Sequence, residues 1–185
     1  RGTKGYYNAQ AGTLGKLLLQ ARRLCEAGSG YVTIHASYAG VWDMHADQNN
    51  LNMWDGMEAV GYSFDHAVAA FIEDCEARGL SDKIMLVCCG EMGRTPKLNE
   101  RGGRDHWARL APLMIYGGGI ERGRVIGKSD RLGGEPITDA YNPRHLISSI
   151  LRTVIDPGQL RLIPNAPQEI LELLDHPPIA GIGLS

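Results

Sequence analysis

The stretch 83–89 (KIMLVCC) is almost continuously apolar. A run this short predicts a β-strand that is covered on both faces. Two other short apolar segments, 31–35 and 112–116, also predict strands. Helical patterns separate the three strands, and strands that alternate with helices favour parallel pairing. The sequence therefore predicts an α/β fold with a largely parallel sheet between helical layers.

Helices are expected where apolar residues recur every three or four positions. The first covers 14–25 and stops before Gly28. The second opens at Ser63, whose side chain suits a helix cap, and ends at Gly79. A third begins at 142–143, where asparagine precedes a first-turn proline. Its expected buried residues are Leu146, Ile147, Ile150, Leu151 and Val154.

Length and charge narrow the class of protein. The 185 residues suit a single domain, 1–185, with a proline-rich tail segment at 157–185. A net charge of -2 provides no basic field for a phosphate backbone, so nucleic acid is a poor candidate partner. No apolar stretch approaches the roughly 18 residues of a membrane span. Because the chain begins with Arg1 and no methionine, we expect it to be part of a longer protein.

The four cysteines show no metal-binding or redox pattern. None has Cys-x-x-Cys spacing, which argues against a zinc ribbon or thioredoxin-like chemistry. We expect free thiols that pack as small hydrophobic groups. A redox role for the adjacent pair would require a thiol-dependent activity. The residues are Cys25, Cys75, Cys88 and Cys89.

The loop after the first predicted strand contains two candidate metal ligands. Asp43 and His45 are two positions apart, so in an extended segment their side chains point to the same side. A carboxylate oxygen and an imidazole nitrogen presented together suit zinc or a similar ion. Most pairs with this spacing nevertheless belong to ordinary polar loops.

The loop after the strand at 83–89 contains a second candidate set. Glu91 stands directly after the strand, where it could cap backbone donors or face a crevice as a ligand. Arg94 has a planar guanidinium that suits a phosphate or sulfate group. The alternative is a surface ion pair between the two, which would contribute little to stability.

The third candidate loop is 102–107 (GGRDHW). Its glycines suggest a tight turn that directs His106 inward, although a lone histidine is more often structural. Together the three loops supply carboxylate, imidazole and guanidinium groups, which are the components of a hydrolytic metal centre. Because sites in open parallel sheets form at the carboxyl ends of the strands, we expect the three loops to meet in one pocket.

Four motifs follow one another along the chain: WDMH at 42–45, GEMGRTP at 90–96, GRDHW at 103–107 and GGGI at 117–120. In this order they resemble one bacterial family, known as domain of unknown function 1501. Its members are similar to sulfatases and alkaline phosphatases. The resemblance covers nearly the whole chain and weakens after about Pro157.

The resemblance implies an alkaline phosphatase-like fold, of which this chain would be the C-terminal portion. Divalent metal ions would lie at the strand ends, with zinc expected first and calcium, magnesium or manganese as alternatives. Arg94 would face the substrate oxyanion and Asp105 would support the site, which makes these two the expected catalytic residues. The expected metal ligands are Asp43, His45, Glu91 and His106, with Glu91 assigned to a second ion.

These features predict a metal-dependent hydrolase of phosphate or sulfate esters carried by a small molecule or a polymer. No serine or threonine here matches the superfamily nucleophile, so we expect that group in a preceding N-terminal part. Met92 stands where the superfamily has histidine, so the alternative is a non-catalytic binding or scaffold protein that retains the fold. The family resemblance also suggests export from the cell, and it leaves the oligomeric state open.

Overall fold

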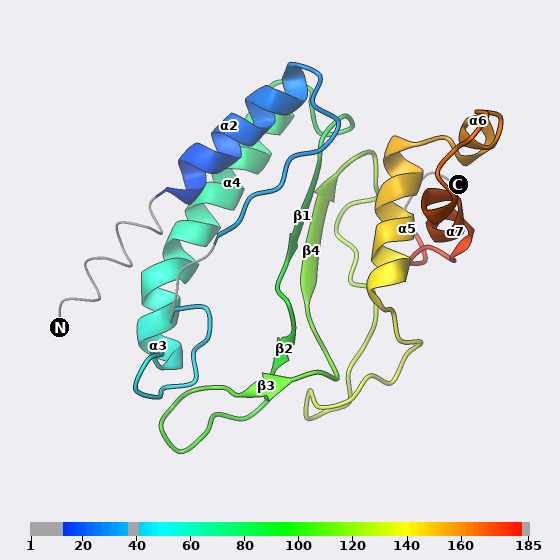
Figure 1. Ribbon diagram of the computed structural model, residues 1–185. Coiled ribbons are helices and arrows are strands. Elements are labelled where there is room, and N and C mark those ends of the chain that lie inside the picture. The colour runs from blue at the N-terminus through cyan, green and yellow to red at the C-terminus, as the bar shows by residue number, and fades with distance from the viewer. Residues whose placement is uncertain (1–12, 37–40, 183–185) are drawn as a thin grey trace.

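The computed structural model describes residues 13–36 and 41–182, and two long helices form one side of it (Figure 1). Helix α2 (Leu14–Glu26) packs along α4 (Tyr62–Ala77). Leu14 and Leu18 of α2 share a buried cluster with α4 residues such as Phe71. Residues four positions apart lie on one helical face, and burying that face stabilises both helices. The helix predicted at 14–25 is confirmed.

A buried charge also joins these helices. Arg22 of α2 is only 3% exposed, and its Nε lies 2.6 Å from Oδ2 of Asp74 in α4. The contact is an ion pair without good hydrogen-bond alignment. Arg22 also pairs with Glu26 one turn along its own helix. A buried guanidinium needs such partners because removal from water disfavours an isolated charge.

The second predicted helix begins earlier than Ser63. Helix α3 (Met53–Gly56) continues through a π-helical turn, η1 (Met57–Gly61), into α4. The side chain of Asn52 accepts a hydrogen bond from the Asp55 backbone nitrogen and so caps the start. Gly61 has helical dihedral angles, so Ser63 lies inside the helix. The predicted cap was wrong because a suitable cap occurs one helical segment earlier.

The sheet differs from the predicted one. Strands β1 (Met85–Cys89) and β4 (Leu113–Gly117) pair antiparallel, with Val87 opposite Ile115. Beyond them, β2 (Gly93–Arg94) pairs antiparallel with β3 (His106–Trp107). Together the four strands form one long hairpin-like ribbon (Figure 1).

The predicted largely parallel sheet between helical layers, and with it the alkaline phosphatase-like fold class, is therefore wrong. A parallel pair needs a crossover connection, usually a helix. The chain between β1 and β4 contains none and returns through β2 and β3, so the two strands run in opposite directions. Residues 31–36 are irregular and pair with no strand among the described residues. β1 is partly buried rather than fully covered on both faces.

The other side of the ribbon faces a group of three helices. These are α5 (Pro143–Val154), α6 (Pro157–Arg161) and α7 (Gln168–Asp175). α5 starts as predicted, because the Asn142 and His145 side chains form a capping box behind the proline. Thr153 of α5 contacts the Met85 sulfur of β1 at 3.8 Å.

The buried face of α5 was predicted correctly only in part, since Leu146, Ile150 and Leu151 are half-buried. Ser148 and Ser149 are completely buried, whereas Ile147 and Val154 are exposed. Ser148 donates a hydrogen bond to the His176 carbonyl at 2.6 Å, and Ser149 accepts one from the Ile179 nitrogen at 2.8 Å. The two hydroxyls satisfy backbone groups of the segment that follows α7, so these serines are the fully buried residues of α5.

No helix in the described residues is long and apolar enough to span a membrane.

The four cysteines are free, as predicted. Cys75 is buried, whereas Cys89 is exposed, so the expected packing as a small hydrophobic group is wrong for Cys89. Burial raises the pKa of the Cys75 and Cys88 thiols. A raised pKa means less thiolate, so these two thiols are poor nucleophiles.

Candidate metal centre

Three segments that are far apart in the sequence meet at the β2–β3 end of the ribbon. Asp43 and His45 come from the loop before α3, and His106 comes from β3. Arg94 of β2 is the cross-strand partner of His106. Directly opposed residues in an antiparallel pair project from the same face. The register therefore presents the guanidinium and the imidazole to the same loop.

The ligand atoms of Asp43, His45 and His106 form a compact triangle. The Nε2 atoms of the two histidines are 3.1 Å apart. Oδ1 of Asp43 lies 3.4 Å from Nε2 of His45 and 3.2 Å from Nε2 of His106. These three residues form a group that could hold a metal ion, with every ligand atom within 4.8 Å of the others.

Asp105 orients one of the two imidazoles. Its Oδ1 lies 3.2 Å from Nδ1 of His45. An ionised carboxylate only accepts hydrogen bonds, so Nδ1 must carry the proton and Nε2 keeps a free lone pair. This tautomer directs the Nε2 lone pair of His45 toward the triangle. A carboxylate behind a ligating imidazole is a recurrent support in metal sites.

Asn99 links the two loops that supply the histidines. Its Nδ2 donates to the His45 carbonyl at 3.0 Å and to Oδ1 of Asp105 at 3.2 Å. Its Oδ1 accepts from the backbone nitrogen of Gly103 at 2.9 Å. We did not predict this residue from the sequence. The available signal was an asparagine three residues before paired glycines, a pattern typical of side-chain-stabilised turns.

Gly103 allows the loops to approach each other. A Cβ atom at this position would lie 2.3 Å from the carbonyl carbon of His45. The next residue, Arg104, donates its backbone hydrogen to the Met44 carbonyl at 2.8 Å. Only a residue without a side chain fits against the 44–45 backbone at this distance. The glycine-rich turn therefore sets the separation between His45 and His106.

Both acidic groups of the site are ionised at neutral pH. Burial acts to raise the pKa of Asp43, but hydrogen bonds from Arg94 and His106 and the Arg94 charge outweigh it, so its pKa lies below the ordinary value. Hydrogen bonds from His45 and Asn99 lower the pKa of Asp105. Charged carboxylates are the form that binds metal ions and accepts from imidazole.

The triangle is open to solvent on one side. The His45 side chain is 17% exposed, whereas those of Asp43 and His106 are 41% and 49% exposed. Arg94 lies against the edge formed by Asp43 and His45. Its Nη2 is 2.5 Å from Oδ1 of Asp43, and its Nη1 is 3.4 Å from Nε2 of His45.

Of the four predicted metal ligands, Glu91 does not join the group. It is exposed in the bend after β1 and lies outside the triangle. The predicted alternative, a Glu91–Arg94 ion pair, is not formed either, because Arg94 pairs with Asp43. No second group of metal-ligating side chains occurs within residues 13–36 and 41–182.

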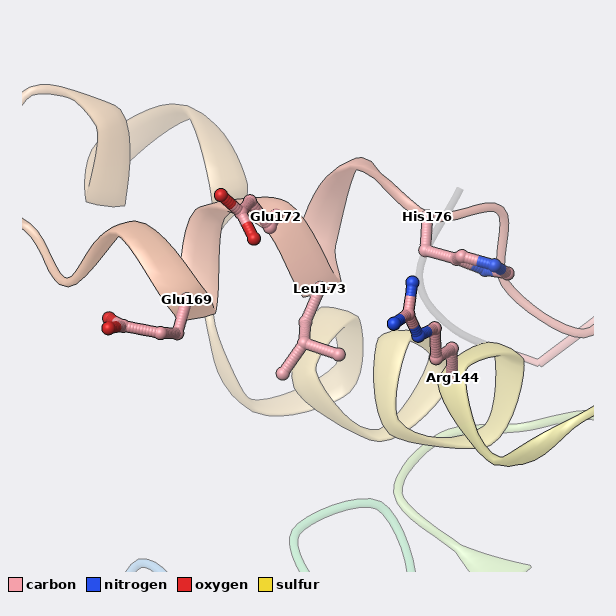
Figure 2. A pocket seen from close by; sticks show the side chains of 5 residues that line it. All are labelled: Arg144, Glu169, Glu172, Leu173 and His176. Carbon is pink, nitrogen blue, oxygen red and sulfur yellow. The ribbon is translucent and has the colours of Figure 1, made fainter.

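A separate cavity of about 200 Å³ lies between α5 and α7 (Figure 2). Arg144 and His176 stand at one end, while Glu169 and Glu172 project away from them at the other. Because the acidic and basic groups do not converge on one point, this cavity offers no ligand set comparable to the triangle.

A family model described as Protein of unknown function (DUF1501) matches residues 2–168. The chain belongs to this family. No curated protein and no solved structure matches the chain. The description of DUF1501 states no activity, so the kinship with sulfatases and alkaline phosphatases stays a prediction. The match includes all three segments that build the triangle, so the site lies within the DUF1501 part of the chain.

Proposed function

We propose that this DUF1501 protein binds a divalent metal ion, with zinc the best fit, and hydrolyses phosphate or sulfate esters. The observation that carries the proposal is the triangle of Asp43, His45 and His106, with sides of 3.1, 3.2 and 3.4 Å. Tetrahedral zinc with ligand bonds of about 2.0–2.1 Å needs ligand atoms roughly 3.3–3.4 Å apart. The three atoms therefore fit one face of such a tetrahedron.

The donor set also suits zinc chemically. Two neutral imidazoles and one carboxylate are ligands that zinc prefers, and a hard ion such as magnesium would favour oxygen atoms alone. Three protein ligands with a solvent-exposed side are typical of catalytic zinc sites, whereas structural sites close the fourth position with another side chain. Among the described residues no fourth ligand completes the triangle.

The surrounding side chains support the proposed reaction class. When bound, a divalent ion supplies Lewis acidity and lowers the pKa of coordinated water. His45 is held by Asp105 in the tautomer that presents Nε2. Arg94 is adjacent to the metal ligands. Its planar guanidinium can donate two parallel hydrogen bonds to a phosphate or sulfate group. Arg94 would thus orient the ester and neutralise its charge as the ester oxygen departs.

One observation favours the non-catalytic alternative, in which the site binds without reaction. Arg94 already contacts Asp43 at 2.5 Å, so the guanidinium neutralises this carboxylate without a bound ligand. In this case the protein would retain an oxyanion or metal ion and release it unchanged. Hydrolysis and binding must therefore be measured separately.

The first experiment measures zinc content after loading and desalting. His106→Ala should weaken zinc binding at least about 100-fold, more than the loss of a supporting group usually does. His35→Ala is the matched control, because His35 is exposed and lies outside the triangle. Equal zinc content in the wild-type protein and His106→Ala would overturn the assignment.

The second experiment follows hydrolysis of aromatic phosphate and sulfate esters, with and without a chelator. We expect turnover that chelation abolishes and added zinc restores. Turnover that survives chelation refutes the metal-dependent mechanism. Zinc binding without any turnover supports the binding alternative.

A further inference from the structure

Arg94 is placed where it competes with a cation. Its Nη2 lies 2.5 Å from Oδ1 of Asp43, the same oxygen that completes the ligand triangle. That oxygen also lies 3.2 Å from Nε2 of His106. A carboxylate oxygen has two acceptor positions, so both are in use. A metal ion can bind this oxygen only if one of the present contacts is given up.

When His106 binds an ion through Nε2, it no longer donates to Asp43, so this contact is given up. The guanidinium that remains on Oδ1 of Asp43 then stands beside a divalent cation, and repulsion between the two positive groups favours its departure. The backbone of Arg94 is fixed by the β2–β3 pairing opposite His106, and only its side chain can move. That side chain is 23% exposed, so a path toward solvent exists. An arginine side chain is long and flexible enough to change position without moving the strand.

We propose that Arg94 couples the binding of a metal ion to the binding of an oxyanion at this site. Without a metal ion, its guanidinium lies against Asp43 and His45. When a metal ion binds, the guanidinium moves to a phosphate or sulfate group that binds beside the ion. This inference rests on the proposed function. It predicts that each of the two ligands strengthens the binding of the other. It also assigns a divalent oxyanion as the group that the site recognises.

The charges of the site support this coupling. Asp43 and Asp105 contribute two carboxylates and Arg94 one guanidinium, so these three groups carry a single net negative charge. A divalent cation reverses the sign and places two positive groups side by side, which disfavours binding. A divalent oxyanion between the metal and the guanidinium restores the balance, and it gives Arg94 a new partner in place of Asp43.

The test is a zinc titration with a competing indicator, at constant ionic strength, in chloride and then in sulfate. For the wild-type protein we expect zinc to bind at least about fivefold more tightly in sulfate, within the usual range of coupling between two ligands. Because coupling is reciprocal, sulfate should bind more tightly to the zinc-loaded protein by the same factor.

The Arg94→Gln variant shows whether Arg94 competes with zinc for Asp43 or only supports the site. We expect this variant to bind zinc in chloride about tenfold more tightly than the wild type, since Asp43 is then released from its competitor. Its zinc affinity should no longer depend on sulfate. Arg94→Lys should retain a smaller sulfate effect, because an ammonium group provides charge without the planar pair of donors.

Arg109→Gln is the matched control, since Arg109 is exposed and pairs with Glu135 away from the triangle. It should behave as the wild type. Circular dichroism checks that each variant is folded, and the wild-type comparison of chloride with sulfate needs no variant at all.

Different results would refute the proposed function and the coupling by Arg94. Wild-type protein that binds no zinc in either salt refutes the proposed function. Zinc binding that is equally tight in chloride and sulfate refutes the coupling alone. Weaker zinc binding by Arg94→Gln in chloride also refutes the coupling, because it would show that Arg94 supports the empty site without competing for it.

Discussion

Replacement of Gly103 by alanine should damage the candidate site and the fold together. The added Cβ would lie 2.3 Å from both the carbonyl carbon and the carbonyl oxygen of His45, and 2.6 Å from the carbonyl oxygen of Met44. These are backbone atoms that cannot rotate away. Ordinary van der Waals contact begins near 3.4 Å, so the 44–45 segment and the 103–104 segment must separate by roughly 1 Å.

The cost follows from this displacement. Inserting a methyl group into a packed contact costs about 1–3 kcal/mol. The hydrogen bond from the Arg104 nitrogen to the Met44 carbonyl, now 2.8 Å, would be lost or stretched. Each such bond contributes about 1 kcal/mol net. We therefore expect a loss of about 2–4 kcal/mol, which lowers the melting temperature by roughly 5–15 °C for a chain of this size.

Metal binding should be more sensitive than stability. Ligand distances in a zinc site must hold within about 0.2 Å, and a separation of roughly 1 Å between the His45 and His106 loops exceeds this tolerance several times. We expect Gly103→Ala to bind zinc at least about tenfold more weakly at a temperature where it remains folded.

Thermal unfolding and an indicator titration check the two expectations. Gly30→Ala is the control, because no atom lies within 4 Å of a Cβ added there. A Gly103→Ala protein that melts within about 1 °C of the wild type would mean that the loops do not meet at this glycine. Unchanged zinc affinity in the same variant would mean that the spacing of the histidines does not depend on it.

Three further perturbations test other contacts. Asp105→Asn removes the carboxylate that holds His45, and zinc affinity measured by titration should fall about 10- to 100-fold, with little change in melting temperature; an unchanged affinity would refute the orienting role. The pKa of Asp74 is held below its ordinary value, mainly by its hydrogen bond from Arg78. The ionised Asp74 therefore stabilises the fold fully above its pKa in the unfolded chain, and this stabilisation is lost as pH falls through its pKa in the folded protein. Denaturant unfolding should therefore show Asp74→Asn destabilised at pH 7 and equal to the wild type in strong acid, and a gap that persists in acid would contradict the assignment. Leu18→Ala should cost about 2–5 kcal/mol in the same assay, because Leu18 is 4% exposed between α2 and α4; a cost below about 1 kcal/mol would place it outside the core.

Helices and strands were predictable where the sequence pattern that indicates them spans only a few neighbouring residues. The apolar spacing of 14–25 and the Asn142–Pro143 start both correspond to observed helices. The strands at β1 and β4 were also found from their apolar runs. The start of α4 was missed, because Asn52 caps a helical segment ahead of Ser63 and a π-helical turn joins the two.

The candidate site was predictable in its chemistry and only partly in its membership. The sequence identified Asp43, His45 and His106 from residue type and spacing, and the structure brings them together. Glu91 looked equally suitable, yet it is exposed outside the group. Asn99 was missed, because an amide can serve many roles and its hydrogen bond to the His45 carbonyl joins segments that are close only after folding.

By itself the sequence indicated the helices at 14–25 and from Asn142, the strands β1 and β4, and the donor groups that are available for a metal. Periodicity, caps and glycine-rich turns act over a few residues, so they can be recognised without knowledge of the fold. Only the tertiary structure decided the direction of strand pairing and the composition of the triangle. Strand direction depends on the path taken between the strands. The antiparallel return through β2 and β3, rather than a parallel sheet, carries His106 to Asp43 across 63 positions of the chain.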